Sequence, residues 1–224
     1  MRKLPISLEC LYSNEVAPSL CCPYPSNADQ QEEAAVTLSP WTAKLREWQA
    51  RAVSGVLTHA SPDFLATATP AAGKTRFALR IAHQYLADRV ASRVLVICPT
   101  NHLRTQWATA AGLVGIQLDP GLTNEQAIEA RDYHGAVVTY QQVCLAPGIF
   151  QRACRSRPTL LIFDELHHAG EGKEWGNALR EAFDEAVFRL ALSGTPFRSD
   201  NNPIPYVRYE QGESQADFTY GYAE

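Results

Sequence analysis

Two short stretches of this chain carry residue types that bind phosphate and its counter-ion. The first is Gly73-Lys74-Thr75, which follows the apolar run 64–68 and opens an amphipathic run over 74–86. A turn at a helix N-terminus presents backbone N–H groups and the positive end of the helix dipole, so it attracts anionic phosphate. Lys74 adds a positive charge, and the Thr75 hydroxyl is a ligand type that Mg²⁺ accepts. The sequence therefore predicts a phosphate-binding loop between a strand and a helix.

The second stretch is the aliphatic run 160–163, which ends in Asp164-Glu165. An Asp at the end of a buried strand can reach the same Mg²⁺ ion through water, as in P-loop phosphoryl transfer. Taken singly, each stretch has a simpler interpretation: a turn followed by a surface lysine, and a strand that ends in solvent. Together they predict a site for a nucleoside triphosphate with Mg²⁺, with Thr75 and Asp164 as metal ligands.

The loop departs from the general phosphate-loop pattern in its glycine content. Ala68 stands where the pattern begins with glycine, and Ala71 and Ala72 precede Gly73. Because alanine tolerates positive φ less well than glycine, the loop either stores some backbone strain or holds negative φ at both alanines. The residues expected to contact the nucleotide from this loop are Thr69, Pro70, Ala71, Ala72, Gly73, Lys74, Thr75 and Arg76.

Segments of strand length and helix length alternate along the chain. Strands separated by helices predict an α/β fold, with a mainly parallel sheet covered by helices on both faces. In such a sheet the chemically suggestive residues gather at the carboxyl ends of the strands. After the loop we expect strands at 93–98, 135–140, 160–164 and 188–193, and helices at 101–113, 151–155 with its flanks, and 175–186; before the loop we expect a helix at 41–59.

The composition of the chain limits the class of protein and the cellular compartment that we expect. With 224 residues and 46% hydrophobic content, it can bury one substantial core. A formal net charge of -4 excludes a strongly basic surface, so any nucleic-acid contact must be local. The six cysteines form no C-x-x-C pair, and no membrane-length apolar run occurs. We therefore expect a cytoplasmic protein that does not contact membranes.

Six segments with chemically suggestive residues follow one another in a fixed order. They resemble the glutamine motif and motifs I, Ia, Ib, II and III of the first RecA-like lobe of a superfamily 2 helicase of the DExH type, over about 45–198. They resemble bacterial and phage DNA helicases and restriction-enzyme motor subunits more than the RNA-directed DEAD-box group. The segments are 45–49, 69–75, 96–100 with Leu103, Gln106 and Trp107, 138–141, 164–167 and 192–196.

This resemblance implies a role for each motif in an ATP-dependent reaction. Gln49 is expected to contact the adenine of ATP. Glu165 orients the attacking water, Asp164 holds Mg²⁺, and Lys74 stabilises charge on the transferred phosphoryl group, so these three are the expected catalytic residues. The resemblance further implies that His167, Ser193 and Thr195 couple the state of the bound nucleotide to the binding of nucleic acid. Residues expected beside the nucleic-acid backbone are Pro99, Thr100, Arg104, Thr139 and Tyr140.

Several of these residues also have plain structural interpretations. Gln49 is compatible with an exposed helix position, Arg104 with a solvated helix face, and Tyr140 with an ordinary strand end. The pair His167-His168 suggests a metal site only if further ligands lie nearby, and zinc needs such a cluster. Trp48 shares the apolar stripe of its helix, which favours core packing.

The motifs divide the chain into three parts. We expect a loosely ordered extension over 1–40, a RecA-like ATP-binding lobe over 41–200, and a connector over 201–224 leading to a second lobe. Helicases of this class close their nucleotide site with arginines from a second RecA-like lobe, which these residues do not include. The partner lobe is thus expected in cis or in trans, and the isolated chain should hydrolyse ATP poorly.

Two functions remain open at this point. The first is the ATP-binding lobe of a DNA helicase or translocase, with DNA favoured over RNA as the nucleic-acid partner. The second is a nucleotide-responsive module that binds nucleic acid or protein without productive turnover. ATP and Mg²⁺ are the expected cofactors of both.

Overall fold

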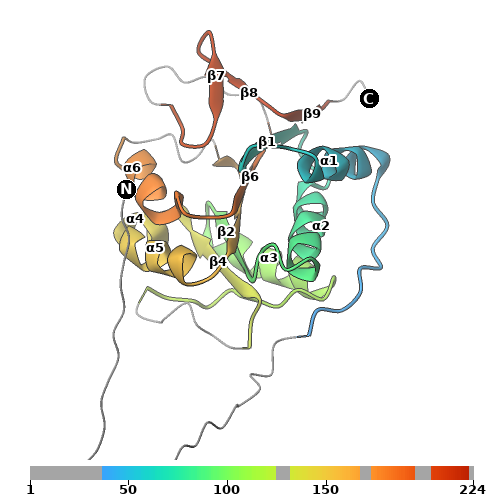
Figure 1. Cartoon of the computed structure of the whole chain (residues 1–224), viewed down its shortest axis with the longest axis horizontal. Helices are drawn as coiled ribbons and strands as arrows, with labels where there is room; N and C mark the ends of the chain where they lie inside the picture. Colours follow the sequence, from blue (N-terminus) through green and yellow to red (C-terminus); the bar gives the residue numbers. More distant parts are fainter. Residues whose placement is uncertain (1–36, 125–131, 167–172, 195–202, 222–224) are drawn as a thin grey trace, which may run out of the picture. The chain divides into compact units, whose positions relative to one another are not determined.

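A seven-stranded parallel sheet forms the centre of the lobe (Figure 1). The computed structural model describes residues 37–124, 132–166, 173–194 and 203–221. The strand order is β3-β4-β2-β5-β6-β1-β9, which confirms the predicted α/β fold with crossovers between strands. The strands of the sheet are β1 (Asp63–Ala68), β2 (Arg93–Cys98), β3 (Leu118–Asp119), β4 (Gly135–Thr139), β5 (Thr159–Phe163), β6 (Phe188–Ser193) and β9 (Phe218–Tyr220).

Helices cover both faces of the sheet, as the alternating pattern predicts. One apolar cluster joins the sheet to the first three helices, and a second cluster joins its other face to the last three. Among the described residues, no helix combines the length and apolar character needed to cross a membrane. The helices are α1 (Glu47–Leu57), α2 (Lys74–Ala87), α3 (Asn101–Gly112), α4 (Tyr140–Leu145), α5 (Pro147–Ser156) and α6 (Lys173–Phe183).

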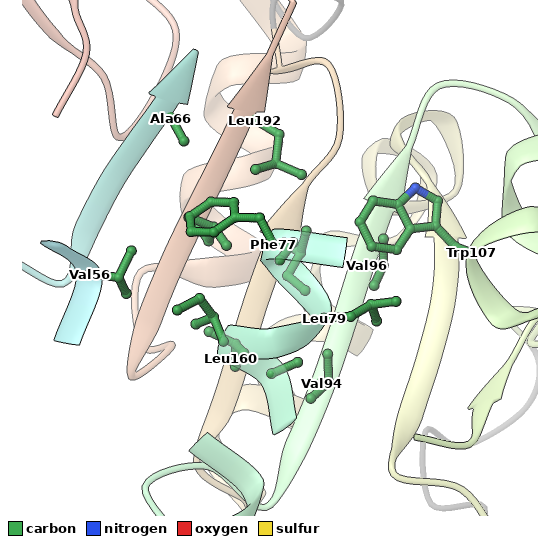
Figure 2. Packing of buried hydrophobic residues seen from close by; sticks show 14 of the residues in the cluster. Val56, Ala66, Phe77, Leu79, Val94, Val96, Trp107, Leu160 and Leu192 are labelled. Atoms are coloured by element: carbon green, nitrogen blue, oxygen red, sulfur yellow. The ribbon is translucent and has the colours of Figure 1, made fainter. Parts of the chain in front are cut away.

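The central strands are mostly apolar and buried throughout, because both of their faces are covered. In β2, Val94 and Val96 pack in the cluster beneath α2, whereas Leu95 and Ile97 pack in the opposite cluster. Figure 2 shows Val94 and Val96 beside the α2 side chain of Leu79. Alternating side chains therefore enter two cores, which explains why these strands lack an alternating polar pattern.

The first helix begins later than the sequence predicts. The expected start at residue 41 is wrong, because residues 41–46 are not helical and α1 begins at Glu47. Arg46 has an extended backbone, and its N–H donates to Gln49 Oε1 at 2.8 Å. This side-chain bond satisfies a backbone donor at the helix start, so it fixes the boundary.

The C-terminal segment, for which we expect a connector over 201–224, also contributes a strand to the sheet of the lobe. β7 (Arg208–Glu210) and β8 (Glu213–Gln215) form an antiparallel hairpin, and β9 then pairs in parallel with β1. Tyr220 stacks on Trp48 with ring centroids 5.0 Å apart. The pattern was missed because three-residue strands are too short to show a period.

Candidate nucleotide site

The predicted site residues come together at one edge of the sheet. Parallel strands present their carboxyl ends on the same side, so the segments that follow β1, β2, β4, β5 and β6 are neighbours. The phosphate loop follows β1, and Asp164-Glu165 follow β5. The topology therefore brings the two halves of the predicted nucleotide site to one edge.

The phosphate loop adopts a turn with two residues at positive φ. Gly73 has φ 97° and Ala71 has φ 60°, while the Ala72 N–H closes the turn onto Thr69 O at 3.1 Å. Ala71 therefore occupies the left-handed region, which answers the question left open by the alanines of the loop. A non-glycine residue there costs about 1–2 kcal/mol, so neighbouring groups must hold the turn.

Two side chains at the start of α1 support the phosphate loop. Arg46 directly precedes the helix, and Gln49 lies in its first turn. Arg46 donates from a guanidinium nitrogen to Ala72 O at 2.8 Å, and Gln49 Nε2 donates to Gly73 O at 2.9 Å. Gln49 is buried, and its Oε1 accepts the N–H of Arg46. The support by Arg46 was not predicted, because no local pattern links residues so far apart in sequence. In this structure the Gln49 carboxamide is hydrogen-bonded to the backbone of the phosphate loop.

We expect Gln49→Ala to weaken binding of inorganic tripolyphosphate and of ATP by the same factor, about three- to tenfold. The reason is that the lost hydrogen bond supports the phosphate loop. Competition with a fluorescent nucleotide measures both affinities. If Gln49 serves only the adenine, ATP binding falls and tripolyphosphate binding does not change, which would contradict the supporting role. Gln84→Ala, in the last turn of α2 and away from the loop, is a matched control in which neither affinity changes.

Lys74 connects the phosphate loop to the acidic pair. Its Nζ lies 3.0 Å from Glu165 Oε1 and donates to Ala68 O at 3.2 Å. The other oxygen of Glu165 accepts the Gly194 N–H at 2.9 Å. One carboxylate therefore lies between the loop lysine and the segment after β6. Glu165 itself has φ 49°, so its backbone is in the left-handed region, a kind of strain that clusters at functional sites.

Asp164 is held by groups from two helices. Trp107 Nε1 donates to Asp164 Oδ2 at 2.8 Å, and the Tyr140 hydroxyl donates to Asp164 O at 3.1 Å. Burial raises the pKa of Asp164, and the Trp107 hydrogen bond opposes that rise. Burial and the charge of Asp164 raise the pKa of Cys98 to about 12, so this thiol remains protonated near neutral pH.

The oxygen donors of the site suit Mg²⁺. Asp164 supplies a carboxylate and Thr75 a hydroxyl, and Mg²⁺ prefers a few such oxygen ligands together with phosphate and water. Within the described ranges, no group of three or more His, Cys, Asp or Glu side chains has the arrangement of a metal cage. His167 and His168 lie outside the described residues, as does Thr195. The donor set fits an ion that is bound jointly with phosphate.

A cavity of about 410 Å³ adjoins the phosphate loop. Its walls come from the segment before α1, the start of α2 and the end of α3, with Gln49, Gly73, Thr75 and Arg76 on the polar side and Leu113 on the apolar side. The volume lies within the range of small-molecule sites. A planar base held there would be next to phosphates on the loop.

The residues predicted to contact nucleic acid divide into accessible and internal ones. Thr100 is exposed and Pro99 is partly exposed, at the start of α3. Arg104 instead donates to two backbone carbonyls, Val137 O at 2.9 Å and Leu122 O at 2.7 Å. Its guanidinium therefore holds β4 and the 118–122 segment together.

Thr139 and Tyr140 are buried, which corrects the expectation that they lie beside the nucleic-acid backbone. The Thr139 hydroxyl accepts the Gln142 N–H and begins α4. Tyr140 is only 1% exposed, and its ring stacks near Phe163 and Trp175. A buried ring cannot stack on a nucleic-acid base. Among the expected coupling residues, Ser193 is fully buried at the end of β6.

Comparison with known proteins decides the family. Residues 42–198 match the family model described as type III restriction enzyme, res subunit. The chain belongs to this family. Its fold is that of a superfamily 2 RecA-like helicase lobe, as the motif order indicates.

One relative and two solved structures extend this comparison. The uncharacterized protein Rv2917 of Mycobacterium tuberculosis is 50% identical over 185 residues, which cover 80% of this chain and 31% of the relative. The Sulfolobus solfataricus SWI2/SNF2 ATPase core in complex with dsDNA has a TM-score of 0.54 at 20% identity, covering 71% of this chain and 34% of that one. The type ISP restriction-modification enzyme LlaGI, in complex with a DNA substrate mimic, has a TM-score of 0.57 at 17% identity, covering 80% and 20%. At such identities the structural likeness shows a shared fold. The chain thus spans about a third of the length of the curated relative.

Proposed function

We propose that this chain is the ATP-binding lobe of an ATP-dependent DNA helicase or translocase, which couples hydrolysis of Mg²⁺-ATP to movement on nucleic acid. The observation that carries the proposal is the contact of Lys74 Nζ with Glu165 Oε1 at 3.0 Å, which joins the phosphate loop to the acidic pair. Phosphoryl transfer to water requires a cation at the phosphate and a carboxylate beside the water. Lys74 provides the cation and Glu165 the carboxylate, and the two side chains are in direct contact.

Each group then has a distinct task in the reaction. Backbone N–H groups of the loop and Lys74 bind the phosphates, and Lys74 stabilises the charge that develops on the transferred group. Glu165 orients the attacking water. Thr75 and Asp164 would hold Mg²⁺, which when bound neutralises phosphate charge. Gln49 and Arg76 border the cavity in which the adenine would lie.

The nucleic-acid partner would contact the carboxyl edge at the start of α3, where Thr100 is exposed. Two structures of similar fold contain DNA or a DNA mimic, which favours DNA over RNA. A second RecA-like lobe, in cis or in trans, would supply the arginines that this class uses for rapid hydrolysis.

The test is to measure ATP turnover by this chain, alone and joined to a second RecA-like lobe, with single-stranded DNA, duplex DNA or RNA. We expect Mg²⁺-dependent ATP binding by the chain alone and slow turnover. We expect DNA-stimulated turnover once the second lobe is present. ATP binding without turnover in every combination would contradict the proposal and favour a nucleotide-responsive binding module.

A further inference from the structure

We propose that Trp107 and Tyr140 are positioning residues that fix Asp164 from two helices and so link the nucleic-acid edge of the lobe to the magnesium carboxylate. This inference rests on the proposed function. Neither residue is expected to touch ATP, Mg²⁺ or nucleic acid. Both act through hydrogen bonds to one residue, Asp164.

Trp107 provides the first link, from α3 to the carboxylate of Asp164. Its ring is only 2% exposed and lies in the cluster that includes Val96 of β2, as Figure 2 shows. Packing therefore restrains the ring, and its Nε1 donates to Asp164 Oδ2 at 2.8 Å. A restrained N–H donor in a poorly solvated place orients a carboxylate strongly, because alternative partners are few.

Tyr140 provides the second link, from α4 to the backbone of the same residue. Its ring lies in a stacked arrangement with Phe163, at 6.5 Å between centroids, and with Trp175, at 6.3 Å. The hydroxyl donates to Asp164 O at 3.1 Å. The carboxylate and the carbonyl of Asp164 are thus held from different helices, which fixes the position and the orientation of the side chain.

Both helices begin at the carboxyl edge of the sheet, where nucleic acid is expected at the start of α3. α3 begins after the exposed Thr100, and Trp107 follows about two helical turns later on the same helix. α4 begins at Tyr140 itself, directly after β4. A shift of either helix when nucleic acid binds would move a group that donates a hydrogen bond to Asp164. Metal affinity and strand affinity would then change together, because such coupling is reciprocal.

The chain contains a matched control for Trp107. Trp48 is also buried, at 3% exposure, but its Nε1 has no hydrogen-bond partner among the described residues. Trp48→Phe and Trp107→Phe therefore make the same change in ring size, and only the second removes a hydrogen bond to Asp164. Tyr140→Phe removes a single hydroxyl and retains the ring. It keeps the inference testable if Trp107→Phe does not fold.

The experiment measures binding of a fluorescent ATP analogue to the 224-residue chain as Mg²⁺ is added, and again in EDTA. We expect Trp107→Phe to raise the half-saturating Mg²⁺ concentration about tenfold, since groups that orient a metal ligand have effects of this size. Tyr140→Phe should raise it about threefold, as suits a neutral hydrogen bond. Trp48→Phe should not change it. Metal-free binding should be equal in all four proteins, which a loss of folding would not produce.

Oligo(dT) added to the same titration tests the link to nucleic acid. We expect it to lower the half-saturating Mg²⁺ concentration of the parent and of Trp48→Phe, and to have a smaller effect in Trp107→Phe and Tyr140→Phe. Equal Mg²⁺ dependence in Trp107→Phe and Trp48→Phe would overturn the positioning role. No effect of oligo(dT) on the parent would overturn the link. A parent that binds no nucleotide would overturn the proposed function itself, and the inference with it.

Discussion

Replacement of Lys74 by alanine should weaken ATP binding by at least about a hundredfold and leave the lobe folded. A charge-assisted hydrogen bond to phosphate contributes about 1.5–3 kcal/mol, and the lost cation also leaves Glu165 facing the phosphates without a counter-charge. The aliphatic part of the side chain adds little to either apolar cluster. Isothermal titration with Mg²⁺-ATP gives the affinity, and thermal unfolding reports the fold.

Lys44→Ala is the matched control for this prediction. Lys44 is exposed before α1 and does not line the cavity beside the loop, so the same loss of charge should change ATP affinity by less than about twofold. Tight ATP binding by folded Lys74→Ala would show that the Gly73-Lys74-Thr75 turn is not the phosphate site.

Replacement of Glu165 by glutamine should lower ATP turnover by about a hundredfold or more, with Mg²⁺-ATP binding nearly unchanged. The amide retains the shape of the side chain but loses the basic oxygen, and general-base catalysis contributes about 10²–10⁴ in rate. Its oxygen can still accept the Gly194 N–H that Glu165 Oε2 accepts. Binding and single-turnover hydrolysis should be measured on one preparation.

Glu185→Gln serves as the control for Glu165→Gln. Glu185 forms an exposed ion pair with Arg155 away from the site, so its neutralisation should leave both binding and turnover unchanged. Turnover by Glu165→Gln at the rate of the parent would mean that another group orients the water, or that the hydrolysis comes from a contaminating enzyme.

The sequence was sufficient for the longer strands of the sheet and for the placement of the loop. β2 and β6 have the predicted bounds, because a strand buried on both faces is mostly apolar. Asp164-Glu165 and Gly73-Lys74-Thr75 lie at one edge because parallel topology requires it. The short strands β7, β8 and β9 were missed, since their pairing depends on contacts distant in sequence.

The sequence did not predict whether an individual polar side chain points into the lobe or toward solvent. Arg104 and Tyr140 have residue types that often contact nucleic acid, yet here they donate hydrogen bonds to backbone carbonyls of the lobe. Position at a strand end fixes the edge and leaves the side-chain direction undetermined. The Arg46 contact with the phosphate loop was likewise hidden, because it joins residues 46 and 72 through the fold.

Hydrogen exchange of the 224-residue chain, with and without Mg²⁺-ATP, tests the central claim most directly. If the nucleotide binds on the Thr69–Thr75 loop, backbone amides there should exchange more slowly when ATP is present, because they donate to phosphate oxygens. The same protection should be absent in Lys74→Ala. Slower exchange confined to other segments, or saturating ATP with no change over 69–75, would contradict the assignment of this lobe as a P-loop ATP site.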